Sequence, residues 1–322
     1  MAVTPHAKSL LDLADRAEVA YAFSPSAARR ARFASQFKFN QTERLETILE
    51  DRTVDAVLVL TPPNTHLELV ERCAGAGKHV LLEKPLEIST ARAEKMVQAA
   101  RKQNVRLGVV LQHRFRPAVE KLTELLKAER LGRLVSASVL IPVWRPQKGY
   151  YDQPGRGTKA RDGGGVLLTQ GIHTLDVFLS LAGEPAEARS FVATTPLHRI
   201  ETEDLVCAAV KFGNGALGVV HATTAAFPGF PERIELIGEK GTALLQGTSL
   251  DVQFHDGERI RFSTYAGGGG TGADPMAFPH DWHRGVLADF LDAIEQGREP
   301  RVNGEEALKV HRFIDSLLQS QR

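Results

Sequence analysis

Two side chains in this sequence, Lys84 and His173, have the chemistry that proton transfer requires. Lys84 lies just past an apolar run that predicts a buried strand, and partial burial lowers the pKa of a lysine toward the range useful for proton exchange. His173 lies on a helix predicted after three successive glycines, and histidine titrates close to neutral pH. The simpler alternatives are a solvated lysine at a strand end and a core histidine whose hydrogen bonds are satisfied.

The first third of the chain must position Lys84, and it alternates short apolar runs with helical patterns. We expect strands over residues 18–23, 54–60, 78–82 and 106–111, and helices over about 5–16, 27–37, 64–75 and 89–104. The run 54–60 is nearly all apolar, as expected of a strand buried on both faces. Strands that alternate with helices in this way predict a parallel sheet of βαβ units.

After residue 113 the pattern changes, so the predicted domains are residues 1–113 and 114–322. Helices are expected over 116–128, 163–182, 280–296 and 304–320, with strands over 134–143, 187–195, 203–212, 215–224, 231–238 and a pair around 242–255. Gly213-Asn214-Gly215 is a strong hairpin signal, and the glycines at 267–272 predict a loop. The predicted fold class is an α/β domain with a parallel sheet, followed by an α+β domain with a mainly antiparallel sheet.

Composition excludes several classes of function. The 322 residues carry a net charge of only +1 and no basic stripe, which argues against nucleic acid as a partner. No run approaches the ~18 apolar residues of a membrane span, and the first residues do not resemble a signal peptide, so we expect a cytoplasmic protein. Two cysteines suggest no disulfide framework, and His280-Asp281-Trp282-His283 lacks the further ligands of a metal site, so no metal is expected.

Three motifs together resemble the glucose–fructose oxidoreductase/inositol dehydrogenase (Gfo/Idh/MocA) family over essentially the whole chain. They are Thr61-Pro62-Pro63-Asn64-Thr65-His66, Glu83-Lys84-Pro85 and the segment 163–173, GGGVLLTQGIH. The resemblance implies a Rossmann-type NAD(P)-binding domain and a substrate and oligomerisation domain. It also implies that Lys84 and His173 are the catalytic pair and that the bond before Pro85 is commonly cis.

One family feature, the glycine-rich phosphate loop of the form G-x-G-x-x-G-x-x-H, does not occur near the start of the chain. If its histidine corresponds to His6, the third glycine falls at Val3 and the others fall before Met1. Either the native protein starts earlier, or the chain is truncated. We therefore expect a gap between the strands at 18–23 and 54–60, where the first strand of such a fold lies, and poor dinucleotide binding by these 322 residues.

Further cofactor contacts are implied by the resemblance at both ends of the nucleotide. The residues at the nicotinamide end are Thr61, Pro62, Asn64, His66, Glu83, Lys84 and Arg114. Asn64 could equally cap a helix, and Arg114 could equally form a structural salt bridge. Ser24 occupies the position where an acidic residue would select NAD, and with Arg29 and Arg30 nearby it favours NADP over NAD, unless both arginines are simply solvated.

In the second domain, the substrate contacts implied are Arg156, Lys159, Thr169 and His173, together with Lys84. Arg156 and Lys159 could hold a carboxylate or phosphate, or could be solvated loop charges. Thr169 departs from the family, which has an aspartate four residues before the histidine. Threonine cannot act as an acid or base near neutrality, so the proton path is in doubt, although Asp176 could orient the imidazole of His173.

The function that we expect is hydride transfer between NAD or NADP and a carbinol of a sugar, cyclic polyol or sugar derivative. One alternative is a hydrolase or lyase of the same family that recycles its cofactor. Another is a non-catalytic binding or regulatory protein on a degraded dehydrogenase scaffold. The partners expected are a small sugar-like substrate and copies of the same chain, in a dimer or tetramer formed through the outer face of the second sheet.

Overall fold

The computed structural model describes residues 3–263 and 279–319, and the chain forms two compact units. The first unit comprises residues 1–87, 91–110 and 279–305, and the second comprises 88–90, 111–278 and 306–322. The segment 279–305 thus belongs to the first unit, although the predicted boundary assigned it to the second domain. It packs there because helix α10 (Asp281–Glu295) contacts helix α1 (Val3–Asp12) and Val302 accepts a hydrogen bond from the backbone of Val109.

The first unit has the predicted parallel strands, divided between two sheets. Strand β1 (Ala22–Phe23) pairs with β2 (Gln41–Thr42), and β3 (Ala56–Val59), β4 (His79–Glu83) and β5 (Leu107–Val110) form the other sheet in that order. In residues 3–263 and 279–319, no strand joins β1 to β3, which is the gap expected from the sequence. The strand predicted at 18–23 is much shorter than expected, and β2 was not predicted.

The buried centre of the first unit lies at β4 and β5. Strand β3 was expected to be buried on both faces, but only Val59 is buried because β3 is an edge of its sheet. Helix α2 buries none of its residues, although its apolar spacing suggested packing. The remaining helices are α2 (Ala27–Ala34), α3 (Leu45–Glu50), the 3-10 turn η1 (Pro63–Thr65), α4 (His66–Gly75) and α5 (Thr90–Lys102), of which α3 was not predicted.

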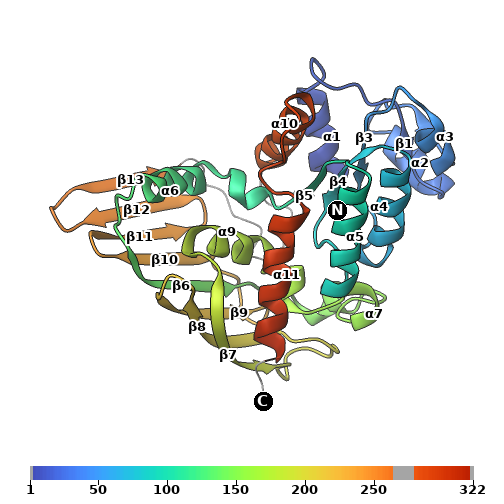
Figure 1. Cartoon of the computed structure of the whole chain (residues 1–322). Coiled ribbons are helices and arrows are strands. Elements are labelled where there is room, and N and C mark those ends of the chain that lie inside the picture. Colours follow the sequence, from blue (N-terminus) through green and yellow to red (C-terminus); the bar gives the residue numbers. More distant parts are fainter. Residues whose placement is uncertain (1–2, 264–278, 320–322) are drawn as a thin grey trace. The chain divides into compact units, whose positions relative to one another are not determined.

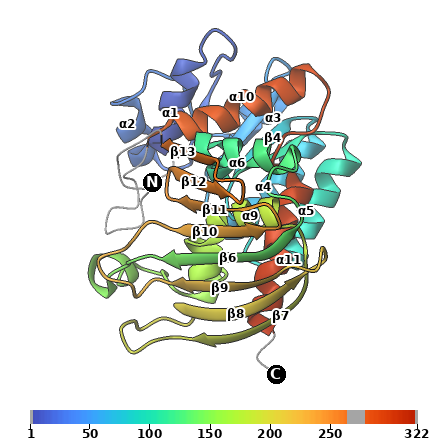
Figure 2. The same ribbon diagram turned by 90° about the vertical axis from the view of Figure 1, so that its left-hand side faces the viewer.

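The second unit is built on an eight-stranded sheet whose order is β13-β12-β11-β10-β6-β9-β8-β7 (Figure 2). All neighbours are antiparallel except β6 and β9, as expected of a mainly antiparallel sheet. The Gly213–Gly215 turn joins β8 to β9 as predicted, and Gly215 has a φ of +89°. The strands are β6 (Leu134–Pro142), β7 (Pro185–Ala193), β8 (Leu205–Phe212), β9 (Leu217–Thr223), β10 (Arg233–Gly238), β11 (Gly241–Gln246), β12 (Ser249–Phe254) and β13 (Arg259–Ser263), the last not predicted.

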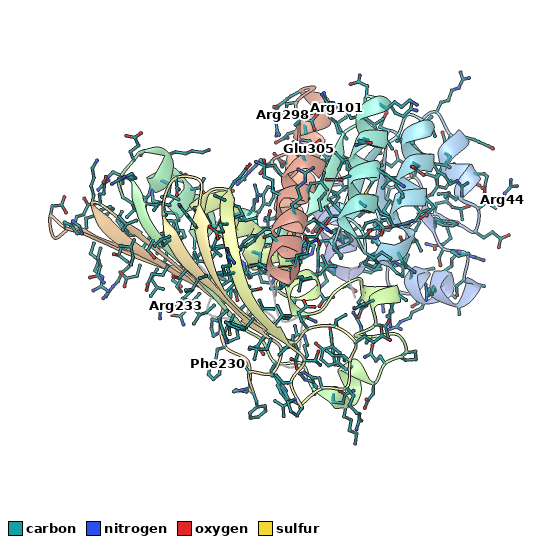
Figure 3. The ribbon with its side chains drawn as sticks, turned by 60° about the horizontal axis from the view of Figure 1, so that its bottom comes forward. Arg44, Arg101, Phe230, Arg233, Arg298 and Glu305 are labelled. Carbon is teal, nitrogen blue, oxygen red and sulfur yellow. The ribbon has the colours of Figure 1, made fainter. Side chains whose placement is uncertain are left out.

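Among the described residues, helices lie on one face of this sheet and none lies on the other (Figure 1 and Figure 3). Figure 1 shows α6 (Pro117–Lys127) and α9 (Ile172–Ala182) on the covered side, where α9 contacts β6 and Phe178 packs against Phe212. Arg233 and Phe230 lie on the side away from the helices (Figure 3). Helix α11 (Gly304–Gln319) reaches β7, where Ser190 donates a hydrogen bond to the carbonyl of Leu317.

The helix predicted over 163–182 is two helices, α8 (Val166–Thr169) and α9, separated at Gln170 and Gly171. The backbone N–H of Gly171 donates to the carbonyl of Val166 at 2.7 Å, which closes α8 and redirects the chain. Thr169 and His173 therefore lie on two different helices and not on the one helix that was predicted. A Cβ at Gly171 would lie 3.1 Å from that same carbonyl oxygen, so glycine suits the close approach.

No single helix in the described ranges is both long and apolar enough to cross a membrane. Only the bent pair Lys159–Thr169 and Ile172–Ala182 meets the length and composition criteria jointly. The glycines at 267–272 lie outside the described residues.

Candidate active site

Lys84 stands at the carboxyl end of β4 with every neighbour buried. It is the only member of residues 80–87 that is not buried. The Glu83 carboxylate accepts a hydrogen bond from His6 Nε2 at 2.8 Å and another from the backbone N–H of Lys84 at 3.1 Å. Burial is the largest single influence and favours the neutral acid, but the hydrogen bond from His6 and the charges of His6, His283 and Lys84 together outweigh it and lower the pKa of Glu83. The peptide that carries Lys84 is thus held rigidly by buried partners, and the bond to Pro85 is cis.

His66 braces the two loops that follow β3 and β4. Its Nδ1 lies 3.1 and 3.0 Å from the carbonyl oxygens of Pro85 and Leu86, and its Nε2 lies 2.9 Å from that of Thr61. Both ring nitrogens of His66 thus face backbone carbonyl oxygens. The ring is completely buried between these backbone groups, which makes His66 a support of the two loops, and its contact with cofactor stays a prediction. Glu83 is likewise buried and bound to His6, and its contact with cofactor stays a prediction.

The donors at this edge of the sheet fit the ribose and amide end of a nicotinamide nucleotide. Val59 and Leu82 are register partners, so the carboxyl ends of β3 and β4 lie side by side, with Thr61 and Lys84 each two residues further on. Pro62 and Asn64 are exposed, and the Thr61 hydroxyl accepts a hydrogen bond from Thr65 at 2.8 Å. Asn64 lies inside η1 and does not cap α4, so its amide can serve a ligand.

Ser24, Arg29 and Arg30, which were expected near the ribose that carries a 2′-phosphate in NADP, differ in their hydrogen bonds and exposure. Ser26 caps α2, and its backbone N–H donates to the Ser24 hydroxyl. Arg30 is bound to the Ser24 carbonyl at 2.6 Å and to Glu43 at 3.0 Å. Arg29 is exposed, so of the two arginines it is the one whose side chain faces solvent.

Helix α10 belongs to the first unit and places a third buried side chain, His283, beside His6 and Glu83. The ligand-type atoms of the three side chains lie within 4.8 Å of one another, and the rings of His6 and His283 meet edge to face at 4.9 Å. Burial lowers the pKa of His283 to about 4, so its imidazole is neutral. The chemistry of these donors suits a divalent cation, but only if the His6–Glu83 hydrogen bond is given up. Sequence spacing could not reveal this cluster, because its members are far apart in the chain.

In the second unit, His173 resembles Lys84 in being partly accessible within a buried stretch of chain. It is the only member of residues 171–179 that is not buried, in the first turn of α9. Its ring packs on that of His113 with centroids 4.8 Å apart and planes tilted by 30°. Arg116 donates from Nη2 to His113 Nε2 at 2.6 Å and forms a buried ion pair with Glu232. Neither His113 nor Glu232 was singled out from the sequence.

Asp176 pairs with Arg114. The suggestion from the sequence that its carboxylate orients the His173 imidazole is not what the hydrogen bonds show. Arg114 donates to the two Asp176 oxygens at 2.8 and 2.6 Å and to Glu306 at 3.1 Å. Burial acts to lower the pKa of Arg114, but these carboxylates outweigh burial and raise it. Arg114 thus forms the structural salt bridge that was the alternative to a cofactor contact, and the contact itself stays a prediction.

Tyr150 links the predicted substrate loop to the break between α8 and α9. Its hydroxyl accepts a hydrogen bond from Gln170 at 2.9 Å, and the guanidinium groups of Arg156 and Arg145 lie 5.1 and 5.6 Å from its ring centroid. Arg156 is therefore not a solvated loop charge, whereas Lys159 is exposed. Thr169 donates its hydroxyl to the carbonyl of Gly165 at 2.6 Å.

Glu203 secures the start of α8 and was also missed. Its carboxylate accepts from the backbone of Gly165 at 2.9 Å and of Leu167 at 3.2 Å, and burial raises its pKa. A Cβ at Gly165 would lie 1.8 Å from the Glu203 carbonyl oxygen, which explains the glycine.

Comparisons with known proteins agree with this architecture. Residues 1–111 match the family described as "Oxidoreductase family, NAD-binding Rossmann fold", and residues 119–244 match the "GFO/IDH/MocA C-terminal domain". The 1,5-anhydro-D-fructose reductase of Ensifer adhaerens is 30% identical over 296 residues, covering 90% of this chain and 85% of that protein. The myo-inositol 2-dehydrogenase of Thermotoga maritima is 28% identical over 266 residues, covering 80% and 75%.

Solved structures show the same fold. A levoglucosan dehydrogenase in complex with NADH has a TM-score of 0.85 and 22% identity over 99% of this chain and 94% of its own. The WlbA dehydrogenase of Bordetella pertussis, solved with NADH and UDP-GlcNAcA, has a TM-score of 0.82 and 24% identity, covering 98% and 91%. With the motifs at Lys84 and His173, these matches establish that the chain belongs to the Gfo/Idh/MocA family of NAD(P)-dependent oxidoreductases.

Proposed function

We propose that this oxidoreductase interconverts a carbinol and a carbonyl on a sugar, cyclic polyol or sugar derivative, with Lys84 and His173 as its catalytic residues. The observation that carries the proposal is that both side chains are partly accessible although their neighbours in the chain are buried. Each is the one accessible residue in an otherwise buried run, and each lies in a family motif. A reactive lysine and histidine need this combination of rigid support and access.

The chain's own residues supply the proton chemistry. A nicotinamide nucleotide, when bound, supplies the hydride acceptor or donor. In oxidation His173 takes the hydroxyl proton, and in reduction it returns that proton to the carbonyl oxygen. Its Nδ1 is buried, so Nε2 is the nitrogen that receives the proton. The Lys84 ammonium donates a hydrogen bond to the same oxygen and stabilises the negative charge that develops there.

Thr169 contributes no acid–base chemistry, because its hydroxyl donates to the Gly165 carbonyl. Its expected role is to hold the α8 end against Gln170 and the substrate loop. Arg156, packed on Tyr150, is proposed to bind an electronegative group of the substrate, and exposed Lys159 is proposed to assist it. At the cofactor, Thr61, Pro62 and Asn64 are proposed to contact the nicotinamide end. Ser24 with Arg29 is proposed to accept a 2′-phosphate, so that NADP is used in preference to NAD.

The test is turnover by purified protein on a panel of sugars and polyols, followed by the absorbance of reduced nicotinamide. We expect His173→Ala to lower kcat by ~10²–10⁴-fold while cofactor binding changes little. His255→Ala, on an exposed strand-end histidine, is the matched control and should retain full turnover. Unchanged kcat in His173→Ala would remove His173 from the mechanism.

Two further comparisons separate the alternatives. Net reduction of added cofactor during turnover identifies a dehydrogenase, whereas product formation without it identifies a hydrolase or lyase that recycles cofactor. Cofactor binding with no turnover on any substrate identifies a binding protein. Because the two proposed catalytic residues come from different units, Lys84→Met should be combined with His173→Ala in a double variant. If the fold-loss in kcat of the double variant is smaller than the product of the two single fold-losses, the two residues act on one substrate.

A further inference from the structure

We infer that His113 is a positioning residue for His173, held neutral and in one tautomer by the buried Arg116–Glu232 ion pair. This inference rests on the proposed role of His173 as the group that exchanges the proton. It explains how the chain supports that histidine although the family's aspartate is replaced by Thr169.

The tautomer of His113 follows from the donors around it. A guanidinium has only N–H donors, and Arg116 Nη2 lies 2.6 Å from His113 Nε2. Nε2 must therefore accept, which places the single ring hydrogen of His113 on Nδ1. A second proton on Nε2 would face the guanidinium directly, so the positive charge of Arg116 keeps the His113 ring neutral.

Arg116 is itself unable to move away from this arrangement. Its side chain is buried, and its guanidinium is paired with the buried carboxylate of Glu232. Its guanidinium also lies 3.3 Å from the carbonyl of Gly247 and its backbone N–H donates to the carbonyl of His113. Breaking this pair would leave an uncompensated charge in the core, so the pair fixes the orientation of the His113 ring.

The neutral ring of His113 then serves His173. The two rings pack face to face with a tilt of 30° and centroids 4.8 Å apart, which restricts rotation of His173. When His173 takes up a proton, its positive charge lies against a neutral aromatic face, a favourable contact, and not against a second imidazolium. Arg114, next to His113 in the chain, and Asp176, one turn after His173, pair with each other, and Arg114 also pairs with Glu306.

Substitutions at position 113 separate the ring from the hydrogen bond. His113→Phe keeps an aromatic face but cannot accept from Arg116. His113→Asn keeps an acceptor but removes the ring. We expect His113→Asn to lower kcat about tenfold and to move the pH of half-maximal kcat downward by ~0.5 unit, with KM little changed. His113→Phe should retain most of kcat, because the stacking face remains.

A second measurement does not depend on activity. In protein labelled with 15N-histidine, NMR signals assigned with His113→Asn and His173→Gln report the tautomer and titration of each ring. His113 should carry its hydrogen on Nδ1 and should not titrate between pH 5.5 and 8, whereas it should begin to titrate in Arg116→Met/Glu232→Leu. This double variant removes both charges together, so that neither is left alone in the core. His255→Asn serves as the control for both experiments.

The outcomes separate this inference from the proposed function. A hydrogen on Nε2 of His113, ordinary titration of its ring, or an unchanged pH profile in His113→Asn would each overturn the positioning role. If instead His173→Ala is fully active while NMR shows His113 stabilising the protonated His173 ring, then the coupling stands and the proposed function fails.

Discussion

The buried histidine His311 gives a prediction about stability whose size follows from the structure. His311 lies on α11, is 2% exposed, and its pKa is lowered to about 4 because burial penalises the charged ring. The unfolded chain, with an ordinary histidine pKa of ~6.5, binds a proton at mildly acidic pH where the folded protein does not. The stabilising contribution of neutral His311 is therefore fully present above pH ~6.5 and is lost as the pH falls toward 4.

At pH 5 the unfolded chain would be almost fully protonated at His311 and the folded protein hardly at all. Proton linkage converts this difference into a loss of about 2 kcal/mol in the free energy of unfolding between pH 8 and pH 5. Because a whole domain is stable by only about 5–15 kcal/mol, a loss of this size is readily measured.

The assay is urea unfolding of the wild type and His311→Leu at pH 8 and pH 5. Fluorescence of Trp144 reports on the second unit in a Trp282→Phe background, because the chain has only two tryptophans. Any cost of the substitution that does not depend on pH cancels in the comparison. We expect the variant to lose about 2 kcal/mol less than the wild type over this pH interval. Equal losses in the two proteins would show that His311 is not held neutral by burial.

Two remaining predictions concern the second unit. Asp176→Asn should lower the free energy of unfolding by about 3 kcal/mol in urea titrations, because the poorly exposed Arg114 then loses its ion pair with the buried Asp176 carboxylate. A loss below about 0.5 kcal/mol would contradict the role of this pair. We also propose that copies of the chain associate through the sheet face without helices, where Leu217 and Val219 are exposed. Val219→Glu should then lower the molecular mass measured by light scattering. A monomeric wild type would disprove the association.

Much of the fold could be predicted because local pattern and backbone geometry agree. The alternation of apolar runs with helical segments predicted the parallel strands of the first unit, and the Gly213–Gly215 turn predicted the hairpin between β8 and β9. The errors fall where local signals are weak or compete. Strand β2 has two residues, and β13 lies at a sheet edge with alternate charged residues. At Gly171 a close backbone contact ends a helix that the apolar pattern alone would continue.

The amino-acid sequence by itself determined the family, and it singled out Lys84 and His173 as the proposed catalytic residues because each stands in a short motif next to an apolar run. Tertiary structure alone decided the partners. Asp176 binds Arg114 instead of His173. The ring that packs on His173 belongs to His113, which lies 60 residues before His173 in the chain. Such pairs join residues with no periodic relation in the sequence. Charge, burial and hydrogen-bond geometry select them only when packing has brought the helices together.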